Sequence, residues 1–125
     1  MGLIVSDEHL LVTAAPDLRQ AAIDWAGYLS RERRLAKNTL EAYQRDLEQF
    51  LRFLTLHLGG PPSLAEMAAL TLADVRAFLA HRRSVGAGAK TLGRQIAALR
   101  SFATPELVHT IRPWMLGLSD EFATT

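Results

Sequence analysis

A single helical pattern over residues 40–58 constrains this chain more than any other feature of its sequence. Its apolar residues recur every three or four positions and form one stripe about five turns long on a helix of about 3.6 residues per turn. These residues are Leu40, Tyr43, Leu47, Phe50, Leu51, Leu54 and Leu58. The run Gly59-Gly60-Pro61-Pro62 predicts a sharp end, because glycine closes helices and proline cannot continue them. We expect this helix to begin at Asn38 or Thr39.

Three shorter helices are expected around it. Asp17 is the predicted cap of the first, which ends in a polar turn over residues 31–37. Residues 63–70 allow a short helical turn, and Thr71 with Asp74 resembles a capping box that opens the next helix. The last helix follows a flexible connection. The residues expected to face the core are Leu18, Ala22, Trp25, Leu29, Leu72, Val75, Phe78, Leu79, Leu92, Ile96 and Leu99.

The composition indicates one soluble domain, and the helical pattern along the chain makes it an all-α bundle. The 125 residues are 49% hydrophobic and carry a net charge of +1, which disfavours disorder. No apolar run approaches the roughly 20 residues of a membrane helix, and the N-terminus lacks the features of a signal peptide. The chain has no cysteine, which excludes disulfides and fits a cytoplasmic location. Its length favours a binding module over an enzyme with its own substrate cleft.

Positive charge is concentrated near the end of the helical region. Residues 81–100 contain five bases and no acid. These bases are Arg82, Arg83, Lys90, Arg94 and Arg100. Such a local field attracts phosphates. An ordinary solvated helix surface gives the same pattern, so charge alone leaves both interpretations open.

Polar side chains also fall opposite the apolar stripes of two helices, at about 100° per residue. They are Lys90, Arg94 and Ser101 in the last helix, and Arg45, Gln49 and Arg52 in the long one. Such side chains suit a major groove, where they reach bases or phosphates. On pattern alone, an ordinary amphipathic helix is the favoured interpretation.

Two separated motifs resemble a known family. The first is Glu32-Arg33, then Asn38-Thr39-Leu40-Glu41-Ala42-Tyr43-Gln44-Arg45-Asp46-Leu47 and Phe50-Leu51; the second is Lys90-Thr91-Leu92, Arg94 and Ala97-Ala98-Leu99-Arg100-Ser101-Phe102. Together they resemble the N-terminal core-binding domain of tyrosine recombinases of the XerC/XerD type. The resemblance implies a SAM-like orthogonal bundle of four to five helices. It also implies that the second and fourth helices lie against the major groove of a recombination site, while a separate C-terminal domain cuts the strand.

The resemblance assigns DNA contacts to five positions, and Arg83 joins them from the basic segment. The predicted DNA-binding residues are Thr39, Arg45, Arg83, Lys90, Thr91 and Arg94. A threonine at a helix start can cap it and offer a hydroxyl and nearby amides to a phosphate. The cations neutralise phosphates, and arginine also pairs bidentately with guanine. Tyr43 and Leu47 match the motif as well, but they lie on the apolar stripe and are expected in the core.

We expect no catalysis by this chain, and neither a cofactor nor a metal. A tyrosine recombinase attacks DNA with a phenolic oxygen near its C-terminus. The only tyrosines here are Tyr28 and Tyr43, inside expected helices of the binding domain. His109 and Arg112 echo a His-x-x-Arg pattern of the family's catalytic domain, and a chance match is the favoured interpretation. The remaining histidines lack metal-ligand spacing and are expected at isolated surface positions: His9, His57 and His81.

The chain divides into an N-terminal extension (1–15), a DNA-binding domain (16–103) and a divergent C-terminal tail (104–125). Because Ala103-Thr104-Pro105 breaks the helix where the resemblance calls for it to continue, we interpret the chain as a truncated product or a fragment. The leading functional interpretation is a module that positions double-stranded DNA in integration or chromosome-dimer resolution. The alternative is a helical protein–protein module that associates with recombinase subunits through its aliphatic C-terminal stretch. Neither interpretation involves a membrane.

Overall fold

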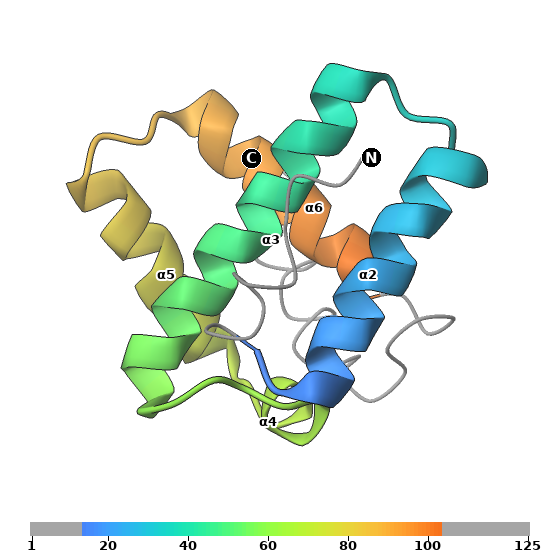
Figure 1. Ribbon diagram of the computed structural model, residues 1–125. Helices are drawn as coiled ribbons and strands as arrows, with labels where there is room; N and C mark the ends of the chain where they lie inside the picture. Colours follow the sequence, from blue (N-terminus) through green and yellow to red (C-terminus); the bar gives the residue numbers. More distant parts are fainter. Residues whose placement is uncertain (1–13, 104–125) are drawn as a thin grey trace.

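The computed structural model describes residues 14–103, which form a bundle of five α-helices (Figure 1). They are α2 (Pro16–Arg31), α3 (Lys37–Leu58), α4 (Leu64–Ala68), α5 (Leu72–Ser84) and α6 (Ala89–Phe102). The described residues contain no strand, so the predicted all-α, SAM-like bundle is confirmed. None of the five helices has both the length and the apolar character that a membrane span requires.

Two helices begin at residues other than the predicted ones. The N-cap of α2 is Ala15, and Pro16 occupies the first helical position, where its missing N–H costs nothing. Asp17 is therefore not the cap: its Oδ1 accepts hydrogen bonds from the backbone N–H of Leu18 (2.6 Å) and of Leu64 (3.3 Å). This carboxylate ties the start of α2 to the start of α4.

The α3 helix begins one or two residues before the predicted position. Its N-cap is Ala36, and no side chain caps its first turn. Thr39 is the third helical residue and does not cap the helix, contrary to the prediction. At the other end, Gly59 closes α3 with a left-handed φ of 88°, as the glycine–proline run predicted.

The core runs through all five helices around Trp25 of α2. Its indole packs edge-on against Phe102 at a centroid distance of 5.5 Å and stacks on Tyr43 at 6.5 Å. Phe50 and Phe78 meet edge-to-face at 5.0 Å and extend the core between α3 and α5. Leu47 is buried and Tyr43 packs half-buried against the core, as the stripe predicted.

Three side chains depart from the predicted inside–outside pattern. Ser101, expected on the outer face of the last helix, accepts a hydrogen bond of 3.0 Å from Nε1 of the buried Trp25. The apolar stripe also ends earlier than predicted, because Leu58 is 38% exposed. Leu72 is only partly buried. Ser101 turns inward because the indole N–H needs a partner inside the core.

A capping box and a histidine hold the start of α5. The Thr71 hydroxyl accepts from the Asp74 N–H, and Asp74 Oδ2 accepts from the Thr71 N–H at 2.8 Å, which confirms the predicted box. Asp74 Oδ1 also lies 2.9 Å from His57 Nε2 of α3. The hydrogen bond from the Thr71 backbone, assisted by His57 and opposed by burial, lowers the pKa of Asp74 from its ordinary value of 3.8. His57 is thus not isolated, contrary to the prediction.

The burial pattern of α3 predicts very different costs for two neighbouring leucine truncations. Leu54 is 0% exposed and Leu56 is 87% exposed. Leu54→Ala should lower the free energy of unfolding by about 2–5 kcal/mol through lost apolar burial and a cavity, whereas Leu56→Ala should change it by less than about 0.5 kcal/mol. Urea unfolding followed by circular dichroism measures both. Similar losses for the two variants would contradict the assigned orientation of α3.

The lowered pKa of Asp74 predicts a pH-dependent contribution to stability. A carboxyl whose pKa is lower in the folded state stabilises that state above the unfolded pKa, and this contribution is lost as the pH falls through the folded value. Asp74→Asn should therefore cost about 0.5–1 kcal/mol at pH 7. As the pH falls below about 3.8 and through the lower pKa of Asp74 in the folded state, the difference between the variant and the wild type should shrink toward zero. Thermal unfolding at several pH values tests this, with the exposed Asp24→Asn as the control; a difference independent of pH would refute it.

Candidate nucleic-acid interface

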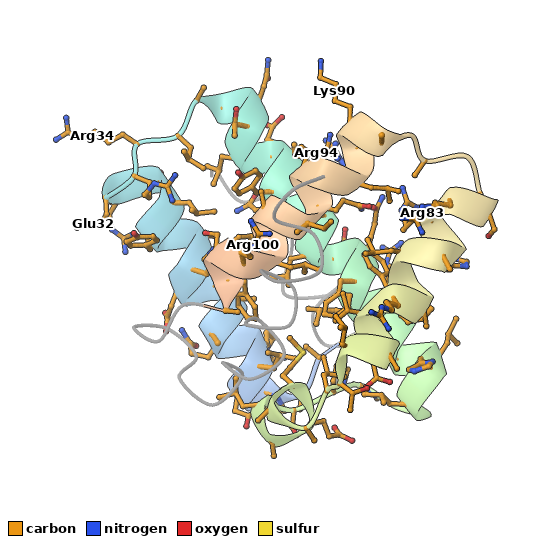
Figure 2. The ribbon with its side chains drawn as sticks, turned by 180° about the vertical axis from the view of Figure 1, so that it is seen from behind. Glu32, Arg34, Arg83, Lys90, Arg94 and Arg100 are labelled. Atoms are coloured by element: carbon orange, nitrogen blue, oxygen red, sulfur yellow. The ribbon has the colours of Figure 1, made fainter. Side chains whose placement is uncertain are left out.

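The upper part of the bundle gathers the first turns of α3 and α6 and the last turn of α5. Figure 1 and the opposite view in Figure 2 agree on this grouping. Exposed cations occur at each of the three helix ends: Lys37 on α3, Arg83 on α5 and Lys90 on α6. Arg45 is exposed about two turns into α3. We call these four residues the basic end.

Most of the predicted DNA-binding residues present their side chains at this surface. Thr39, Arg45, Arg83 and Lys90 are exposed, and Thr91 is half-buried in the first turn of α6. Figure 2 shows Lys90 extending away from the bundle. Within residues 14–103, no acidic side chain forms an ion pair with the three cations of this group. Their charges therefore face solvent.

Both helices that start at the basic end lack a side-chain cap. The N-caps of α3 and α6 are Ala36 and Gly88, whereas α4 and α5 begin with capping boxes. The first backbone N–H groups of an α-helix have no acceptor inside the helix and lie at the positive end of its dipole. The basic end thus combines mobile cations with fixed backbone donors, which is an arrangement that binds phosphate.

Arg94 departs from the predicted outward orientation. Its Nε and Nη2 donate to Oδ2 and Oδ1 of Asp46 on α3, each at 2.8 Å. Asp46 is 1% exposed and Arg94 is 38% exposed at the side chain. The hydrogen bonds to Asp46 raise the pKa of Arg94, although burial opposes the shift. Arg94 therefore links α6 to α3 and does not project freely like Lys90.

A second polar contact joins the same helices beside this pair. Gln95 is 0% exposed, and its amide donates to Gln49 Oε1 at 2.6 Å. Its own oxygen accepts from Nε of Arg82 on α5 at 3.4 Å. Gln49, predicted to point outward, is thus turned toward α6. We call Asp46, Gln49, Arg94 and Gln95 the polar seam.

The two buried members of this seam, Asp46 and Gln95, were not predicted from the sequence. Asp46 lies within the first family motif, but its partner is 48 residues away and no local pattern identifies it. The available signal was position, because on a helical wheel Asp46 falls at the edge of the apolar stripe, about 40° from Phe50. Gln95 lies at the edge of the apolar side of α6 in the same way.

The other predicted outward cation and the histidines contribute nothing further to this surface. Arg52 is exposed, and its Nη2 lies 3.6 Å from Oε2 of Glu48 on the same helix. His57 stacks on Phe53 at a centroid distance of 5.1 Å, and His81 packs against the same ring in a tilted arrangement at 5.7 Å, so His81 is not isolated either. Among the described residues, no group of three potential ligands is placed to hold a metal ion. His9, His109 and Arg112 lie outside those residues, as does the tail over 104–125.

Comparison with known proteins assigns the chain to a family. Residues 22–104 match the phage integrase N-terminal SAM-like domain. Tyrosine recombinase XerC of Mesorhizobium japonicum is 53% identical over 94 residues, which cover 75% of this chain and 30% of that protein. XerC of Brucella suis is 52% identical over 98 residues, covering 78% and 31%, and XerC of Rhizobium meliloti is 53% identical over 94 residues, covering 75% and 30%. No solved structure gives a significant match.

The family match over residues 22–104 includes the basic end. The chain spans about 30% of the length of these curated relatives. The match to the family and the sequence identity agree with the observed helical bundle. This chain belongs to the phage integrase N-terminal SAM-like domain family, and its relatives are tyrosine recombinases of the XerC type.

Proposed function

We propose that residues 16–103 are a DNA-binding unit that positions a recombination site, with the basic end directed at the duplex. One observation carries the proposal: two uncapped helix starts and four exposed cations share one surface. The similarity to tyrosine recombinases supports it, because enzymes of that name act on a polyanion and need to hold it in place.

Each predicted residue has a distinct physical role in this arrangement. Lys90, Arg83 and Arg45 neutralise phosphates, and each such contact releases counterions from the duplex. The first-turn amides of α3 and α6 donate to phosphate oxygens along the helix dipole. Thr39 and Thr91 each stand third in their helices and add a hydroxyl donor beside those amides.

The bundle contributes binding and orientation, and we assign strand cleavage to no residue within 14–103. Cleavage in tyrosine recombinases requires a phenolic nucleophile beside groups that stabilise the phosphoryl transition state. Tyr28 and Tyr43 pack half-buried against the core, and Tyr43 stacks on Trp25. Chromosome-dimer resolution and integration remain the reactions that we propose for a complete recombinase to which such a unit contributes.

A second candidate function is contact with another recombinase subunit. The aliphatic stretch on which this alternative was based lies outside the described residues. Within them, an open hollow of about 550 Å³ between α3 and α5 is lined by Phe53, Leu56 and His57, among others. The 87% exposed Leu56 is an apolar side chain available to a partner. Light scattering with and without duplex separates the two functions: dimers that form without DNA, together with no DNA binding, favour the alternative.

Binding to a duplex should depend steeply on salt. We expect Lys90→Ala to weaken binding to all sequences and to reduce the slope of log K against log salt concentration by about 0.9. Fluorescence anisotropy at several salt concentrations measures this slope, using a recombination half-site and a scrambled duplex. Arg19→Ala is the matched control, because Arg19 lies in the first turn of α2. Figure 1 shows the start of α2 at the bottom of the bundle, opposite the starts of α3 and α6. A flat salt response, or an equal effect of both substitutions, would reject the proposed interface.

A further inference from the structure

A buried carboxylate lies directly beneath the basic end. Asp46 is 1% exposed, and both of its oxygens accept hydrogen bonds from one edge of the Arg94 guanidinium. Figure 2 shows Lys90 and Arg94 on the same helix, one extending from the bundle and the other lying against it. An acid at this depth is unexpected in a surface that attracts phosphates, because its charge opposes theirs.

The pair changes what Arg94 can contribute electrostatically. Burying one carboxylate without a partner is strongly unfavourable, so Asp46 keeps Arg94 engaged. The two charges cancel at short range, and Arg94 adds little to the field that gathers phosphates. The basic end therefore owes its net attraction to its own four cations, which have no acidic partner within residues 14–103: Lys37, Arg45, Arg83 and Lys90.

The pair also fixes the geometry of Arg94. A guanidinium has five N–H donors in one plane, and Asp46 uses two of them. The remaining donors are held in a set direction relative to α3, at a side chain that is still 38% exposed. Gln49 holds the adjacent Gln95 in the same way, by accepting a hydrogen bond from its amide. A pinned arginine loses little conformational entropy on binding, which favours one defined acceptor over many phosphates.

We propose that Asp46 is a positioning residue for sequence specificity. It holds the Arg94 guanidinium in an orientation that suits one acceptor in the recognised sequence, and it neutralises the Arg94 charge toward the phosphates of unrelated sequences. The proposal rests on the proposed function, because it assumes that the basic end faces DNA. The two members of this ion pair then affect DNA binding in opposite ways. Asp46 restrains binding to unrelated sequences, and Arg94 contributes chiefly to the correct site.

The test is Asp46→Asn, measured by anisotropy against a half-site and a scrambled duplex at several salt concentrations. Asparagine keeps the size of the side chain and one acceptor oxygen but leaves the Arg94 charge unmasked. We expect scrambled-duplex affinity to rise about five- to tenfold at 0.1 M salt, with the salt slope steeper by about 0.9, because one further phosphate contact forms. The preference for the half-site should fall. Asp24→Asn on α2 is the control for the loss of one negative charge elsewhere.

Substitutions of Arg94 test the same proposal independently. Arg94→Ala should weaken half-site binding at least about fivefold while leaving the scrambled-duplex salt slope unchanged, because the charge it removes is already masked. Arg94→Lys should lose the preference for the half-site as Arg94→Ala does, since lysine lacks the planar guanidinium with its paired donors. In the double variant Asp46→Asn/Arg94→Ala, the gain in slope should disappear. The two single substitutions of Arg94 keep the proposal testable if Asp46→Asn fails to fold.

Failure of this inference can be told apart from failure of the proposed function. If wild-type binding is salt-dependent and Lys90→Ala reduces the slope, the basic end binds DNA. If Asp46→Asn then behaves like Asp24→Asn, or Arg94→Ala lowers the slope as much as Lys90→Ala, the positioning role is overturned. If the wild type shows no salt-dependent binding, the proposed function itself fails.

Discussion

The packing of α6 across α3 is the interaction on which the rest of this bundle depends. On one side the contact is apolar: the indole of Trp25 from α2 stacks on Tyr43 of α3 and meets Phe102 of α6 edge-on. On the other side it is polar, with Asp46 and Gln49 of α3 bonded to consecutive residues of α6. Apolar burial supplies most of the stabilisation, but it is non-directional. The hydrogen bonds of the polar seam add direction, so that the two helix starts are held beside each other.

The hydrogen bonds between α3 and α6 explain why the surface at their starts is suited to a polyanion. Backbone amides at a helix start are fixed in direction only if the helix itself is fixed, and the seam performs that task for α3 and α6. The exposed cations need no such precision, because a flexible lysine or arginine neutralises a phosphate from many positions. The cations of the basic end thus attract the duplex over a distance, and the polar seam fixes the directions of the helix starts that the duplex meets.

The sequence predicted the helices and most of the core but not the contacts between helices. The stripe over residues 40–58 and the box at Thr71 are local patterns, and local patterns survive folding. Ser101 and Asp17 took other roles because their hydrogen-bond partners come from distant segments, Trp25 and Leu64. The site was predicted in the same uneven way. Lys90 and Arg83 are exposed as their positions predicted, whereas the orientation of Arg94 depended on an acid that no spacing rule connects to it.

In the proposed interface, a DNA duplex contacts the starts of α3 and α6. The most direct measurement is the perturbation of backbone amide chemical shifts of the full chain on titration with a recombination half-site. We expect the largest changes over residues 37–39 and 89–91, with smaller ones near Arg83. Changes confined to the start of α2 and to α4, with the amides of the basic end unmoved, would contradict it.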